Sequence, residues 1–167
     1  VIQIKNILSR ISNRLRENYD FNFSDNELKI QVTENYKIEI GGQPLDFGHK
    51  GKLSHVVYLF YLINHKSKFG RKDLSIGGVA HEKFMLLYNH IYSKIYEDEV
   101  NRYVKSITSV HSRISTRIKN QLNIEALAHK YGFNSSNTKQ DVTVYYIDIS
   151  PEHLSIPSDL LSFKVNY

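Results

Sequence analysis

The stretch from Thr108 to Leu122 is the feature that most constrains how this chain can fold. Its apolar residues recur every four positions and so lie on one stripe of a helix: Val110, Ile114, Ile118 and Leu122. Thr108 or Ser109 stands where an N-cap residue is expected, and Asn123 follows the last apolar position as a stop signal. The pattern predicts an amphipathic helix that buries one stripe.

The rest of this helix carries side chains that suit a duplex DNA partner. They are basic, hydroxyl-bearing or amide side chains: Ser112, Arg113, Thr116, Arg117, Lys119 and Asn120. Arginine can donate two hydrogen bonds to guanine, asparagine can pair with adenine, and small hydroxyls can bind phosphate. An ordinary surface helix has a similar composition, so this segment alone leaves both interpretations open.

The positive charge of the chain is concentrated in two blocks. The whole chain has a formal net charge of +5. Residues 50–72 contain six basic side chains and no acidic one, and residues 101–140 contain seven basic side chains and one acidic one. The other parts are net acidic. Clustering of this kind is typical of proteins that bind a polyanion, although solvated basic surfaces are also common.

Length and composition bound the class of protein. A chain of 167 residues fits one domain with a hydrophobic core, and the absence of cysteine excludes disulfides, thiolate metal sites and cysteine nucleophiles. No apolar run is long enough for a membrane-spanning helix, and no signal-peptide pattern opens the chain. We therefore expect a cytoplasmic protein with no membrane partner. Because it begins with Val1 rather than Met, we also expect it to be part of something longer.

The first 27 residues are predicted to form an amphipathic helix followed by a connector. Apolar residues step along it by four, three and four positions: Ile4, Leu8, Ile11 and Leu15. This spacing fits two heptads, which could form a homodimer or pack against the domain that follows.

The remainder alternates between strand and helix patterns. Strands are predicted over 28–32 and 36–40, with residues 41–44 breaking the sheet before an extended pair at Leu45 and Phe47. One-sided helices are predicted over 52–65, 81–95 and 97–107, with shorter pieces at 71–75 and 124–131. A polar loop over 134–141 precedes a strand over 142–149, and residues 151–167 form a C-terminal tail.

This order of elements resembles the winged helix-turn-helix effector domain of OmpR/PhoB-type response regulators. The resemblance lies in five stretches and covers roughly residues 28–149: the strand and turn over 37–47, the apolar helix at 56–62, the start of the second helix at 71–74, the basic helix at 110–122, and the returning wing strand at 143–147. A long helix between Gly77 and Glu97 departs from that pattern, and so does the segment 124–131. The resemblance implies an α+β, mostly helical fold over 28–150, a winged helix-turn-helix with small antiparallel β elements and an extra N-terminal helix.

The same resemblance implies sequence-specific binding of double-stranded DNA, as the DNA-reading part of a transcriptional regulator. Arg113 and Arg117 are then the best candidates for base or phosphate contact, with Thr116, Lys119 and Asn120 beside them. Ser112 would bind phosphate near the helix N-terminus. Lys139 would lie at the wing tip with Asn137 and Thr138, and Lys50 and Lys52 would contact phosphate from the start of the first long helix.

Motifs for catalysis or for cofactor binding are weak. His81-Glu82 begins like a zinc-protease signature, but Met85 stands where the second histidine is required. Neither a nucleophile elbow nor a phosphate-binding glycine loop is present in the sequence. We expect no enzyme, no metal and no cofactor. Two alternatives remain, a winged-helix module that binds protein and a nucleic-acid-processing enzyme. The tyrosines at 58, 61, 145 and 146 could stack on bases, although core packing is the more common use.

Overall fold

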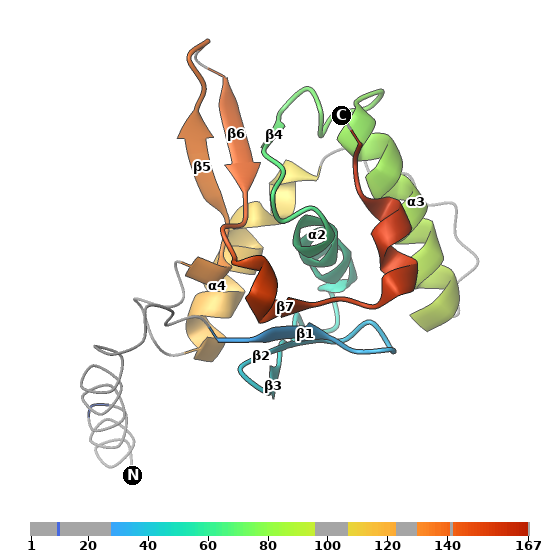
Figure 1. Ribbon diagram of the computed structural model, residues 1–167, viewed down its shortest axis with the longest axis vertical. Coiled ribbons are helices and arrows are strands. Elements are labelled where there is room, and N and C mark those ends of the chain that lie inside the picture. Colours follow the sequence, from blue (N-terminus) through green and yellow to red (C-terminus); the bar gives the residue numbers. More distant parts are fainter. Residues whose placement is uncertain (1–9, 11–27, 96–106, 123–129, 141, 167) are drawn as a thin grey trace.

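A central helix organises the structure (Figure 1). The structure is a computed structural model, and it describes residues 10, 28–95, 107–122, 130–140 and 142–166. This helix, α2, spans Lys52–Ile63. Each of its residues from Val56 to Ile63 is at most 1% exposed. The sequence pattern predicts a one-sided helix, but α2 is apolar around its whole circumference and must be covered on every side. Tyr58 and Tyr61 are fully buried, which confirms that they belong to the core.

A four-stranded sheet covers one side of α2. It contains β1 (Ile30–Val32), β2 (Ile38–Ile40), β3 (Gln43–Pro44) and β7 (Leu154–Ser155), in the order β3-β2-β1-β7. The strands β1, β2 and β3 are antiparallel, whereas β7 runs parallel to β1. The prediction that residues 41–44 break the sheet is wrong. Gly41 and Gly42 have φ of 58° and 80°, which only glycine adopts readily, and they turn the chain directly into β3.

A second, three-stranded sheet lies on another side of α2. Its strands are β4 (Phe69–Gly70), β5 (Asn134–Asn137) and β6 (Thr143–Tyr146), in the antiparallel order β4-β6-β5. The predicted loop over 134–141 is therefore too long, because its first half, Asn134–Asn137, forms β5. Polar side chains do not prevent a strand here, since the partner strand β6 supplies the backbone hydrogen bonds.

Helices close the remaining sides of the core. The helix α3 (Val79–Ile95) packs on α2, and α4 (His111–Leu122) follows a 3₁₀ turn, η1 (Thr108–Val110), on the other flank. The predicted N-cap is wrong, because Thr108 and Ser109 lie within that turn and Val110 is the residue directly before α4. Residues 71–75 form turns rather than the predicted short helix. The predicted N-terminal helix and dimer seam, most of 97–107 and most of 124–131 lie outside the described residues.

The segment 151–166 is an integral part of the domain rather than the predicted tail. It contains η2 (Pro151–His153), β7 and η3 (Ser158–Phe163), and Leu160 and Val165 belong to the core. Asn64, at the end of α2, holds it in place. Its Nδ2 donates to the carbonyl oxygens of Phe60 at 2.9 Å and Phe163 at 3.5 Å, and its Oδ1 accepts from the Val165 N–H at 2.7 Å.

Two small sheets around packed helices make this an α+β fold, as predicted. Among the helices of the described residues, none is both long and apolar enough to cross a membrane.

We expect Asn64→Ala to lower the free energy of unfolding by about 2 kcal/mol, because the buried Val165 N–H and Phe60 carbonyl lose a partner. Urea denaturation followed by circular dichroism measures this change. Asn35→Ala, at an exposed asparagine, is the matched control and should change the stability little. Equal stabilities of the two variants would contradict the assigned role of Asn64.

Candidate nucleic-acid interface

The helix α4 attaches to the core by one stripe and exposes the rest of its surface. Ile114 and Ile118 are fully buried, and Val110 in the preceding turn is 3% exposed. All of the α4 residues proposed from the sequence to contact DNA are exposed: Ser112, Arg113, Thr116, Arg117, Lys119 and Asn120. The helix has 12 residues and so is about 18 Å long, and the diameter of an α-helix, about 10–12 Å with side chains, suits the width of a DNA major groove.

Arg113 differs from the other basic side chains of α4 in its contacts within the protein. Among the residues that the structure describes, it makes no ion pair and no hydrogen bond through its guanidinium group. It lies one turn before Arg117 on the same helix face. All five of its N–H donors are therefore available to a phosphate or to a guanine edge.

Arg117 is partly engaged within the protein. Its Nε donates to the backbone carbonyl of Asp46 at 2.8 Å, and Gln121 holds the same residue through its side-chain amide. Gly48 packs against this guanidinium so closely that a Cβ atom there would lie 2.6 Å from Nη2. Arg117 therefore anchors the loop 46–48 to α4, a role that its sequence spacing did not reveal.

The hairpin of β5 and β6 stands beside α4 and is fixed to it at its base. The Ser115 Oγ accepts a hydrogen bond from the Phe133 N–H at 3.0 Å. His111, the first residue of α4, stacks on Phe133 with ring centroids 4.3 Å apart and lies 4.9 Å from the ring of Tyr145. The base of the hairpin is therefore fixed against the start of α4.

Lys139 lies at the tip of this hairpin, as proposed from the sequence. The tip is closed by Thr138, whose N–H donates to the Val142 carbonyl at 2.9 Å and whose hydroxyl accepts the Val142 N–H at 3.2 Å. Asn137 accepts a hydrogen bond from the Thr143 hydroxyl at 3.1 Å, so its amide is used within the hairpin. Lys139 is exposed and projects from an ordered turn.

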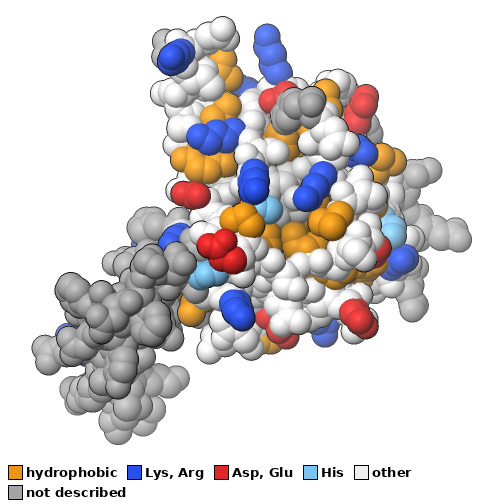
Figure 2. Space-filling view, viewed as in Figure 1, with side chains coloured by type: hydrophobic (Ala, Val, Ile, Leu, Met, Phe, Trp, Pro, Cys, Tyr) orange, Lys and Arg blue, Asp and Glu red, His pale blue; other side chains and the backbone are white. Residues whose placement is uncertain are grey.

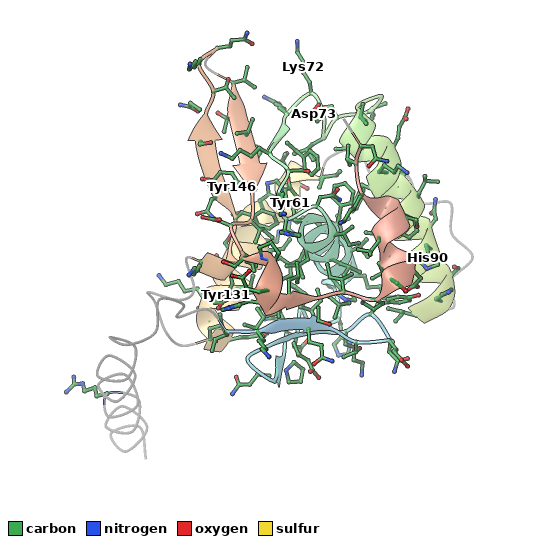
Figure 3. The ribbon with its side chains drawn as sticks, in the orientation of Figure 1. Tyr61, Lys72, Asp73, His90, Tyr131 and Tyr146 are labelled. Carbon is green, nitrogen blue, oxygen red and sulfur yellow. The ribbon has the colours of Figure 1, made fainter. Side chains whose placement is uncertain are left out.

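Further basic side chains, which were not among the site residues proposed from the sequence, flank the hairpin on either side of β4. Lys68 Nζ lies 4.7 Å above the ring of Tyr146, and Arg71 and Lys72 are exposed in the following turn. Lys72 points away from the body of the protein, and basic side chains are spread over the hairpin and this turn (Figures 2 and 3). The excess of positive charge over 50–72 was the sequence signal for them.

The structure separates Lys50 from Lys52. Lys50 is exposed in the turn that begins at Gly48, beside the loop held by Arg117. Lys52 Nζ instead lies 5.9 Å from the ring centroid of Tyr92 on α3. Only Lys50 is therefore placed on the α4 side of the domain.

His111 is an unusual residue at the start of this surface. It is 6% exposed, and in the described part of the chain neither ring nitrogen has a hydrogen-bond partner. Tyr61 closes the aromatic enclosure at a centroid distance of 5.2 Å (Figure 3). Burial lowers the pKa of His111 from 6.5 to about 4, because an imidazolium could not be solvated there.

Within the described ranges, no set of three His, Asp or Glu side chains could hold a metal ion.

No protein-family model, no curated protein and no solved structure matches this chain.

We expect His111→Phe to flatten the acid dependence of stability. Native His111 stays neutral while the unfolded chain takes up a proton, so its contribution is complete above pH 6.5 and is lost as the pH falls toward 4. The slope of unfolding free energy against pH should fall by up to about 1.4 kcal/mol per pH unit in the variant. Urea denaturation at a series of pH values tests this. Identical slopes in the two proteins would contradict it.

Proposed function

We propose that this domain binds double-stranded DNA, with α4 in the major groove and the β5–β6 hairpin as a wing against the backbone. The observation that carries the proposal is the exposed polar face of α4. It is attached to the core on one stripe only, and it presents an uncommitted Arg113 beside small hydroxyl and amide side chains. A reading helix requires this combination of a rigid mount and free donors.

The order of elements supports a winged-helix interpretation. The helices α2, α3 and α4 follow one another, and a hairpin returns beside the last of them. The strand β4, between α2 and α3, extends the hairpin into a three-stranded sheet. By analogy with OmpR/PhoB-type domains, α4 would be the recognition helix and the protein would act in transcriptional regulation. Sequence-specific reading would then rest on Arg113 and Asn120, and Lys139 would contact phosphate.

A protein-binding module is the second candidate, and one observation favours it. Three large apolar side chains at the start and along the outer part of α3 are exposed: Ile76 at 58%, Val79 at 50% and Leu86 at 58%. Val79 and Leu86 are seven residues apart and so share one helix face. This face is separate from the α4 surface in sequence, so variants can test the two functions independently.

DNA binding and protein binding differ in how the binding affinity depends on salt concentration. We expect the chain to bind a random-sequence DNA duplex in a fluorescence anisotropy assay, and the logarithm of its affinity to fall linearly with the logarithm of salt concentration. Lys139→Ala should reduce that slope by about 1, because it removes one phosphate contact. Arg113→Ala should reduce it by about the same amount, because on DNA of random sequence this arginine contacts phosphate rather than its specific base. Arg113→Ala is cleaner than Arg117→Ala, which would also release the Asp46 loop.

Lys37→Ala provides the matched control. Lys37 is exposed near the start of β2, and the adjacent Tyr36 contacts His90 on α3 and Asp159 on η3 rather than α4. Its loss removes the same charge from the chain but should leave the slope unchanged. No binding at low salt, or equal slopes in all three variants, would overturn the proposed interface.

A further inference from the structure

A hollow opens where the C-terminal segment meets the end of α2. Its volume is about 160 Å³, and seven residues line it: Ile63, His65, Pro151, Leu154, Ile156, Leu161 and Lys164. Five of these side chains are apolar, the other two, His65 and Lys164, contain nitrogen, and none is acidic. In Figure 2 hydrophobic side chains and a histidine gather beneath two basic side chains near the middle of the face.

The walls of this hollow are held by contacts already described. Asn64 ties the backbone at Phe163 and Val165 to the end of α2, and Lys164 therefore lies beside His65. On the opposite side, β7 is paired with β1 through Leu154 and Ser155. The hollow is thus part of the packed domain and is preformed, as small-molecule sites usually are.

The charges that act on His65, at one wall of the hollow, are positive. Burial lowers the pKa of His65, and the charges of Lys66 and Lys164 lower it further. His65 Nδ1 lies 3.2 Å from the Leu62 carbonyl, which can only accept, so Nδ1 carries the hydrogen of a neutral ring. Two ammonium groups therefore act on a wall that is otherwise neutral and largely apolar.

We propose that this hollow binds a small organic carboxylate of about six to nine non-hydrogen atoms, with its apolar body against Leu154, Ile156 and Leu161 and its carboxylate at Lys164. The size follows from volume, since a cavity of roughly 150 Å³ holds one benzene molecule. Inorganic phosphate would leave the apolar walls uncovered, and a cation would be repelled by the two lysines. The inference does not depend on DNA binding.

Titration of the full chain with sodium benzoate, followed by NMR of the backbone amides and methyl groups, tests this proposal. We expect saturable shifts at Ile63, Leu154, Leu161 and Lys164 with a Kd of about 1 mM. Benzylamine, which has the same ring and the opposite charge, should cause no saturable shift at these residues. Lys164→Gln, at an exposed position that can change without loss of the fold, should weaken benzoate binding at least about tenfold.

Lys37→Gln is the control for net charge and should bind benzoate as the wild type does. No saturable shift with benzoate, equal binding of benzylamine, or an unchanged Kd in Lys164→Gln would each overturn the proposal. Tighter binding of inorganic phosphate than of benzoate at the same residues would overturn the assignment to a carboxylate.

Discussion

Complete burial of α2 is the constraint on which the rest of the structure depends. Eight consecutive residues from Val56 to Ile63 have almost no contact with water, so every side of this helix needs a cover. Two sheets, α3, α4 and the C-terminal segment supply it, each with one apolar side. Burying a large aliphatic or aromatic side chain stabilises a protein by about 1.5–3 kcal/mol, so this one helix contributes a large part of the stability of the domain.

The same constraint decides which surface α4 can offer. Because α4 covers α2 with a narrow stripe at Ile114 and Ile118, most of its circumference remains outside. His111 and Ser115 then join it to the base of the hairpin. A rigid helix that presents an exposed Arg113 loses little backbone entropy on binding, and this is the physical basis of the DNA-binding proposal.

Local patterns predicted the helices better than the connections. The four-residue spacing located α4, and alternation located β1 and β2, because each element depends on its own side chains. The turn at Gly41, the strand β5 and the placement of 151–166 depend on partners distant in sequence. Among the proposed site residues, exposure on α4 followed from its periodicity. The Arg117–Asp46 contact and the separation of Lys50 from Lys52 required the tertiary fold.

Chemical-shift mapping with a short random-sequence duplex tests the central claim most directly, because it locates the bound surface residue by residue. The DNA-binding account predicts that the largest amide shifts fall on residues 112–120 of α4 and 138–140 of the hairpin, with none around Val79 and Leu86 on α3. Shifts confined to the apolar face of α3, or no shifts at low salt, would contradict it.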